Sequence, residues 1–143
     1  MTLYENLNGG AIMPIIEIKA LPQKEGVDTA GAMKTICVRL ADKMGIEPKQ
    51  VWATWTTIAP GLYTEGEIQA KVQPYSTHPP LVNMLAFEGK SDREIEEAML
   101  TIAEVLSKQL QIDPENIFIK YDETRSGRVF TGGTTIIKTK HGK

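Results

Sequence analysis

The spacing of hydrophobic residues changes twice within the first half of the chain, from a continuous run to a helical period and then to an alternation of two. Residues 14–21 form a short apolar run, and apolar side chains then recur at helical spacing between Asp28 and Gly45. Residues 51–56 are β-branched and aromatic and alternate with a period of two. Asp28 is a good helix N-cap and Gly45 a good helix stop. The pattern predicts a strand, a helix and a second strand.

The same plan returns in the second half. Residues 80–86 are again an apolar run, Ser91 with Glu94 forms a capping box, and 117–121 have strand character. The stripe of Ile95, Met99, Ile102 and Leu106 predicts a buried helix face between them. Glycine, proline, serine and threonine dominate the connection 60–79, in which we expect a brief strand at 67–72. The β-branched residues 134–138 predict a closing strand before a basic tail.

The two halves are copies of one unit. Residues 14–66 align with 80–132 at a constant offset of 66 with 12 identities in 53 positions, among them the prolines Pro14 and Pro80. Random pairing gives about three identities at roughly even residue usage. We therefore expect an extension at 1–12, a single domain at 13–133 with repeat units 14–66 and 80–132, and a C-terminal strand and tail at 134–143.

Two β-α-β units predict an α+β fold. Right-handed crossovers give parallel pairing inside each unit, and the two units form a four-stranded mixed sheet with two helices on one face. Alternation turns Trp52 and Phe118 to the face opposite Val51, Ala53, Ile117 and Ile119, which should meet the helices. A large apolar face without a helix to cover it predicts oligomerisation.

Composition narrows the function. The chain has 143 residues, a net charge of −2, one cysteine and two histidines. This charge gives no reason to expect a nucleic-acid partner or an anionic membrane surface, and no apolar run approaches the ~20 residues of a membrane span. No residues have metal-ligand spacing. We expect a cytoplasmic protein without a metal.

Three stretches resemble the tautomerase superfamily. Residues 87–92 are similar to a Leu-Glu-Gly-Arg-Ser-Asp stretch of 4-oxalocrotonate tautomerase, and 126–133 to the glycine-rich hairpin of that family. Residues 113–121 resemble a stretch of macrophage migration inhibitory factor. The resemblance covers about 14–133 and implies a homotrimer with active sites near subunit boundaries, no cofactor and a small carboxylate-bearing substrate. The fused length is that of the inhibitory-factor, malonate semialdehyde decarboxylase and cis-chloroacrylic acid dehalogenase groups.

The resemblance also assigns site residues. Pro14 corresponds to the family's catalytic proline, and Lys90 stands where relatives carry a carboxylate-binding arginine, although lysine lacks the bidentate grip of arginine. Lys24 is the weaker counterpart of Lys90 in the first copy. The remaining candidates for substrate binding are Phe118, Lys120, Arg128 and Trp52.

Plainer interpretations stand beside these assignments. Lys90, Lys120 and Arg128 could be solvated surface charges, and Trp52 and Phe118 could pack in a subunit interface. A strand-opening role is sufficient to explain Pro80.

The function that we expect depends on whether the nitrogen of Pro14 is a free amine or part of a peptide bond. A free terminal proline is a secondary amine that an apolar pocket keeps neutral and basic, whereas an amide nitrogen linked to Met13 has no useful basicity. If the mature chain starts at Pro14, we expect a tautomerase or isomerase of a small 2-oxo or enol acid. If residues 1–12 remain, we expect a non-catalytic scaffold or binding protein. A decarboxylase, hydratase or dehalogenase is a further alternative, for which only Glu17 and Glu123 offer a water-activating carboxylate.

Overall fold

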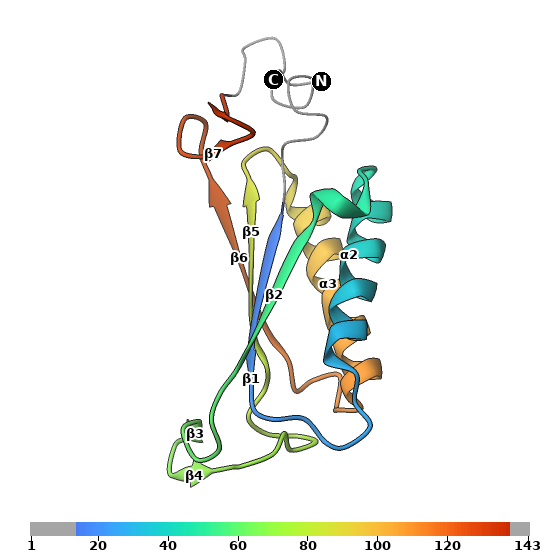
Figure 1. The fold of residues 1–143 in the computed structure, drawn as a ribbon, viewed down its shortest axis with the longest axis vertical. Coiled ribbons are helices and arrows are strands. Elements are labelled where there is room, and N and C mark those ends of the chain that lie inside the picture. Colours follow the sequence, from blue (N-terminus) through green and yellow to red (C-terminus); the bar gives the residue numbers. More distant parts are fainter. Residues whose placement is uncertain (1–13, 138–143) are drawn as a thin grey trace.

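The first β-α-β unit begins directly after Pro14. A computed structural model describes residues 14–137 (Figure 1). In it, β1 spans Ile15–Ala20, α2 spans Thr29–Met44, a 3₁₀ turn spans Pro48–Gln50 and β2 spans Trp52–Thr57. The strand–helix–strand order that the sequence predicts is confirmed.

The second unit repeats these elements. Strand β5 spans Leu81–Phe87, α3 spans Asp92–Leu110 and β6 spans Phe118–Thr124. Trp52 donates its backbone N–H to the carbonyl of Pro14 at 3.0 Å, and Phe118 donates to the carbonyl of Pro80 at 3.2 Å. The two copies therefore share hydrogen bonds as well as sequence.

Each unit also ends in a small hairpin. Strands β3 (Thr64–Glu65) and β4 (Ile68–Gln69) pair in the first, and β7 (Phe130–Thr131) and β8 (Thr134–Thr135) in the second. The hairpins lie at opposite ends of the molecule (Figure 1). The brief strand expected at 67–72 is thus one arm of a hairpin. The closing strand is shorter than expected, since 136–137 are not in a strand and 138 lies outside the described residues.

Local signals set the helix ends as expected. Asp28 Oδ1 accepts from the N–H of Gly31 at 2.9 Å, and Gly45 ends α2 with φ of 70°. Ser91 and Glu94 form the reciprocal capping box of α3, at 3.1 and 2.9 Å. Gln111 closes α3 with φ of 58°, a conformation that glycine adopts more readily. The C-terminal ends of the two helices thus follow the repeat even where the residue changes, whereas α3 begins three residues earlier in its copy than α2 does.

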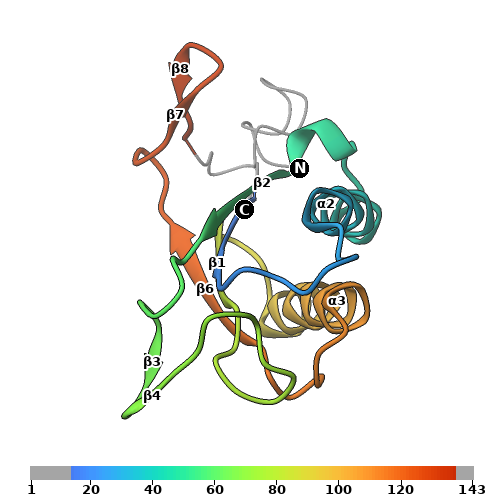
Figure 2. The same cartoon turned by 60° about the horizontal axis from the view of Figure 1, so that its bottom comes forward.

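The four long strands form one mixed sheet in the order β2-β1-β5-β6. Pairing is parallel within each unit and antiparallel between β1 and β5, where Ile15 lies opposite Leu85. Both helices cover the same face (Figure 2). The predicted α+β fold is confirmed, and β2 and β6 are the two edges of the sheet.

The core lies between the sheet and the helices. It is built from buried residues of both copies, including Ile16, Ile18, Ile36, Leu40, Val82, Met84, Ile102 and Leu106. Trp52 and Phe118 lie on the open face, 45% and 53% exposed, as alternation predicts. The expectation of a large apolar open face is corrected, because Glu17, Lys19 and Lys120 alternate onto the same face.

The connection between the copies is fastened by buried polar side chains. Asn116 donates to the carbonyl of Thr77 at 2.8 Å, and Gln73 donates to that of His78 at 2.9 Å. His78 is 1% exposed, and its Nε2 lies 2.9 Å from the carbonyl of Ile68. Since buried polar groups are costly unless paired, these bonds fix the path of the connection.

Neither helix in residues 14–137 is long and apolar enough to span a membrane.

Candidate functional site

Pro14 lies buried where β1 begins, at one end of the sheet. The antiparallel pairing of β1 with β5 brings the end of β5 to the same place. The end of β6 and the β7–β8 hairpin lie at this end too (Figure 1). Segments far apart in the sequence therefore meet around Pro14.

A cavity of about 200 Å³ opens at this end of the sheet. The walls that residues 14–137 contribute are mostly hydrocarbon and carry no charged side chain; they are Ile15, Trp52, Leu85, Ala86, Phe87, Thr124, Val129, Phe130, Thr131 and Ile136. Ile15 follows Pro14 directly. We call this space the proline cavity. Such surroundings disfavour a charged form of any amine placed in them.

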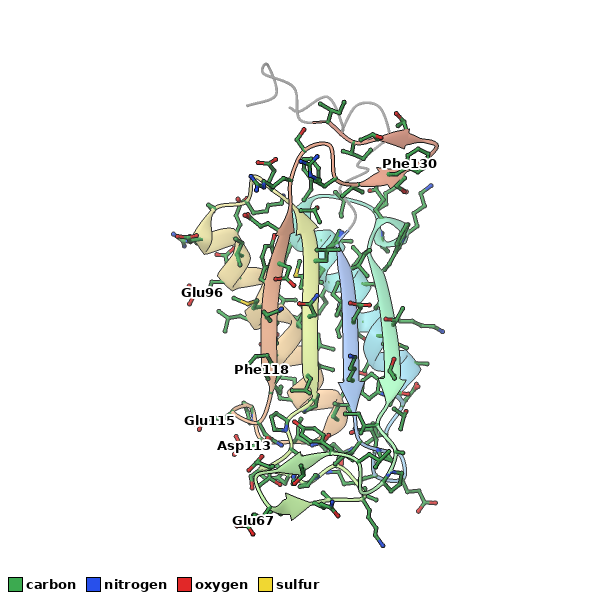
Figure 3. All side chains as sticks on the ribbon, turned by 90° about the vertical axis from the view of Figure 1, so that its left-hand side faces the viewer. Glu67, Glu96, Asp113, Glu115, Phe118 and Phe130 are labelled. Atoms are coloured by element: carbon green, nitrogen blue, oxygen red, sulfur yellow. The ribbon has the colours of Figure 1, made fainter. Side chains whose placement is uncertain are left out.

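The β7–β8 hairpin forms the outer wall of the proline cavity. Ile136 donates its N–H to the carbonyl of Val129, and Gly127 donates to that of Ile136, both at 2.8 Å. Gly127 has φ of 81°, which a side chain would strain. These bonds hold Ile136 against Phe87, where both are buried. Figure 3 shows Phe130 at the tip of this wall, where it is 72% exposed.

Lys90 follows the end of β5, at the Pro14 end of the sheet, but lies on the helix side. It lines a second cavity of about 120 Å³ with Lys43, Glu94, Tyr121 and four other residues. Hydrogen bonds from Ser91, aided by the charge of Lys90, lower the pKa of Glu94. Burial, and to a smaller extent the charges of Glu123 and Glu94, raise the pKa of Tyr121 to about 12. Lys24, the counterpart of Lys90 in the first copy, donates from its Nζ to the carbonyl of Gln111 at 2.9 Å.

Phe118 and Lys120 line a third depression, of about 370 Å³, on the open face. Lys120 forms an exposed ion pair with Asp122 at 3.3 Å. Phe118 begins β6 and so lies at the end of the sheet away from Pro14. Arg128 is exposed in the turn that leads into β7, and its Nη1 donates to the carbonyl of Gly127 at 3.4 Å.

One chain therefore brings together only part of the predicted site. Trp52 lies in the proline cavity next to Pro14, and Lys90, Phe118 and Lys120 line other surfaces. Sequence reasoning missed most of the cavity wall, although the hairpin was recognised. The alternation of Val129 and Thr131 in that hairpin was the available signal. Within residues 14–137 no group of side chains could hold a metal ion.

No protein-family model and no curated protein matches the chain, but solved structures do. R7 fused 4-OT, an asymmetric trimer, is 13% identical with a TM-score of 0.73, over 85% of this chain and 94% of that chain. Pt0534, solved after inactivation by 2-oxo-3-pentynoate, is 9% identical with a TM-score of 0.74 over the same shares. N1, of the cis-3-chloroacrylic acid dehalogenase family, is 11% identical with a TM-score of 0.66, over 85% of this chain and 82% of that chain.

Identities this low carry information about the fold alone, and the fold agrees over most of both chains. The neighbours include fused 4-OT, which the motifs at 87–92 and 126–133 indicated, and a member of the cis-3-chloroacrylic acid dehalogenase family, a group named above for its fused length. The chain has the tautomerase-superfamily fold, in the form that joins two β-α-β units in one polypeptide.

Proposed function

We propose that this protein is a cofactor-independent tautomerase or isomerase of a small 2-oxo or enol acid, with Pro14 as the general base once its nitrogen is free. The observation that carries the proposal is the burial of Pro14 at the start of β1, beside a cavity to whose walls residues 14–137 contribute no charged group. The tautomerase-superfamily fold supports it, since the neighbours include fused 4-OT.

The surroundings of Pro14 suit a base. A terminal amino group has an ordinary pKa of about 7.7–8.0, and removal from water lowers it by disfavouring the ammonium form. A neutral secondary amine can take a proton from the carbon next to a carbonyl and return it to another atom of the same molecule. In the printed sequence this nitrogen is joined to Met13. The proposed activity therefore requires a chain that begins at Pro14.

The other groups in the proposal bind the substrate. Lys90 follows the end of β5 at the Pro14 end of the sheet but lines the cavity on the helix side, so its side chain would have to turn toward Pro14 to hold the carboxylate or steady the developing enolate oxygen. Trp52 would wall the apolar part of the pocket. Phe118, Lys120 and Arg128 would contribute at a boundary between subunits of a homotrimer. The walls of the proline cavity, Thr124 and Thr131 apart, favour a substrate with one carboxylate and an apolar remainder. The proposed location is the cytoplasm.

The dehalogenase and hydratase alternatives need a carboxylate that activates water. Glu17 and Glu123 are the candidates from the sequence, and neither lines the proline cavity. Glu17 lies on the exposed open face, and Glu123 is exposed on β6. This placement favours proton transfer within the substrate over addition of water.

The test compares chains that differ at one nitrogen: residues 1–143, residues 14–143, and residues 14–143 with alanine in place of Pro14. Ketonisation of phenylenolpyruvate and of 2-hydroxymuconate is followed spectroscopically. Only the chain beginning with proline should be active. Alanine should lower kcat/KM by roughly 10²–10⁴-fold, the usual contribution of a general base. Pro80→Ala in the trimmed chain is the matched control, and it should fold and retain the activity.

Labelling and mass determination complete the test. The reagent 2-oxo-3-pentynoate, which inactivates Pt0534, should add to the trimmed chain at Pro14 and leave the chain 1–143 unlabelled. The intact mass of the protein made from its native gene shows which chain exists. A native chain that keeps residues 1–12, together with a trimmed chain without activity above background, would favour the scaffold or binding protein instead.

A further inference from the structure

The sheet ends in two edge strands, each flanked by the helix of its own unit. On one side, α2 lies beside β2, and on the other, α3 lies beside β6 (Figure 3). The constant offset of 66 allows the two flanks to be compared residue by residue. Edge strands leave backbone groups unpaired and commonly need a cover.

The α2/β2 flank contains a shallow groove of about 590 Å³. Its lining is mostly apolar and consists of Ala30, Met33, Lys34, Cys37, Val38, Pro48, Lys49, Val51 and Ala53. Val38 is 54% exposed. The charged side chains in the lining, Lys34 and Lys49, are both exposed. The α2/β2 flank is therefore an apolar depression with a basic border.

The α3/β6 flank, made of the positions 66 residues later, has the opposite charge. Glu96 replaces Ala30, Glu115 replaces Lys49, and Leu100, 62% exposed, replaces Lys34. Figure 3 shows Glu96, Asp113 and Glu115 along this side of the molecule. The α3/β6 flank is therefore an exposed apolar surface with an acidic border.

These charges are largely available to a partner. In residues 14–137, Lys34 and the carboxylates of Glu96 and Glu115 have no ion pair, and Lys49 reaches only Glu47, at 3.6 Å with both side chains more than 70% exposed. An exposed pair of this kind contributes little. Surface charges that are not neutralised within their own chain can steer and orient association.

We propose that the α2/β2 flank of one copy binds the α3/β6 flank of the next copy, so that the charges on the two flanks fix a head-to-tail order of subunits. Pairing of like flanks would set Lys34 and Lys49 against the same lysines, or Glu96 and Glu115 against the same glutamates, and is disfavoured. A head-to-tail contact joins different patches, and it closes into a ring where the rotation between subunits closes, as in a trimer. The inference deepens the homotrimer of the proposed function and rests on that assembly.

Charge reversal tests the order of subunits. Lys34→Glu with Lys49→Glu makes both flanks acidic, and Glu96→Lys with Glu115→Lys makes both basic. Sedimentation velocity at low salt should show each double variant dissociating, with an association constant lowered on the order of tenfold or more. The quadruple variant, in which the two flanks exchange signs, should assemble like the wild type.

Mixing the two double variants gives a sharper result. Acidic flanks then meet basic flanks only between unlike chains, so subunits must alternate around any ring. A ring of three cannot alternate, and the mixture should form heterodimers or even-numbered assemblies instead of the wild-type species. Native mass spectrometry reads the composition directly.

The control reverses two exposed charges away from both flanks, Glu25→Lys with Lys71→Glu, and should leave assembly unchanged. Circular dichroism and thermal melting confirm that every variant folds. Double variants that assemble with wild-type affinity, or a folded quadruple variant that stays dissociated, would overturn the proposal. Because the readout is assembly, a trimmed chain that forms the ring and lacks ketonisation activity would refute the proposed function and leave this inference intact.

Discussion

The ends of the sheet at Pro14 and at Pro80 have similar backbone structures and differ in the side chains around them. Pro14 and Pro80 are both buried, each opens a strand, and each carbonyl accepts a hydrogen bond from an aromatic residue that opens the neighbouring strand. A hairpin at the same offset lies near each of them. The duplication has therefore produced two similar frames.

The hairpin near Pro80 is tied to the chain that leads into the proline. Tyr63 donates its hydroxyl to the carbonyl of Pro79 at 2.7 Å, and Glu65 Oε1 accepts from the N–H of His78 at 2.9 Å. At the offset of 66 these two side chains become Val129 and Thr131, which line the proline cavity. One hairpin fastens the chain, and the other bounds an apolar space. The comparison teaches that the side chains, and not the duplicated backbone, assign a function to each end.

Giving position 131 the glutamate that its counterpart, position 65, carries near Pro80 should weaken the proposed base. In the trimmed chain, Thr131→Glu places the carboxylate of Glu65 in the proline cavity. A nearby negative charge favours the ammonium form, so the pKa of the Pro14 amine rises and less base is present at pH 7. The same charge repels the substrate carboxylate. We expect kcat/KM for phenylenolpyruvate at pH 7 to fall by roughly 10–100-fold, because a pKa raised by about one to two units removes much of the neutral base and the repulsion of the substrate carboxylate adds to the loss.

The pH profile separates this effect from simple damage. The acid limb of kcat/KM should move to higher pH in Thr131→Glu, and Thr131→Gln, of the same size without the charge, should keep the wild-type limb. A profile that moves equally in both variants would mean that side-chain size, and not charge, governs the cavity.

The buried amides of the connection offer a second comparison between the copies. Asn116 is 5% exposed and donates to the carbonyls of Pro74, Tyr75 and Thr77. Its counterpart Gln50 is 8% exposed and accepts one bond, from the N–H of Glu47 at 2.8 Å. Asn116→Ala leaves several carbonyls without a donor and should lower the free energy of unfolding by about 1–3 kcal/mol. Gln50→Ala should cost roughly 1 kcal/mol, like the loss of a helix cap.

Urea denaturation of the two variants measures both values. Equal losses would show that the connection does not depend on Asn116 more than the 3₁₀ turn depends on Gln50. A larger loss in Gln50→Ala would reverse the comparison.

The elements that the sequence predicted well are those set by neighbouring residues. Asp28, Gly45 and the Ser91–Glu94 box act within one helical turn, and period-two alternation alone put Trp52 and Phe118 on the open face. The apolar character of that face was overestimated because the prediction weighed two aromatic residues and not the charges between them. The full alternation, with Glu17 and Lys19 on β1, was present in the sequence.

The candidate site was harder to predict because it is assembled from distant segments. The proline cavity joins Ile15, the end of β5 and a hairpin that ends beyond residue 135, and no local pattern encodes that meeting. The resemblance assigned Lys90 and Phe118 to the same site as Pro14. Lys90 follows the end of β5 at the Pro14 end of the sheet but lines the cavity on the helix side, whereas the register of β6 puts Phe118 at the other end of the sheet. Only pairing between β1 and β5 determines which residues share an end of the sheet.

The smallest expected effect concerns Tyr121, which takes the place of Trp55 on the helix face of the second copy. Its hydroxyl is buried and has no hydrogen-bond partner among residues 14–137. Tyr121→Phe removes this unpaired group at nearly constant volume, so stability at pH 7 should stay equal or rise by up to about 1 kcal/mol.

The pH dependence of the same variant tests the burial of the phenol. Because the folded pKa of Tyr121 is raised from 10.0 to about 12, its neutral form contributes stability in full below pH 10, and this contribution is lost as the pH rises toward 12. Wild type should therefore lose more stability than Tyr121→Phe in that window, as urea denaturation at a series of pH values would show. Parallel curves, or a Tyr121→Phe variant less stable at pH 7, would mean that the hydroxyl is hydrated or bonded, and that the second copy has kept a polar contact where the first has only the indole of Trp55.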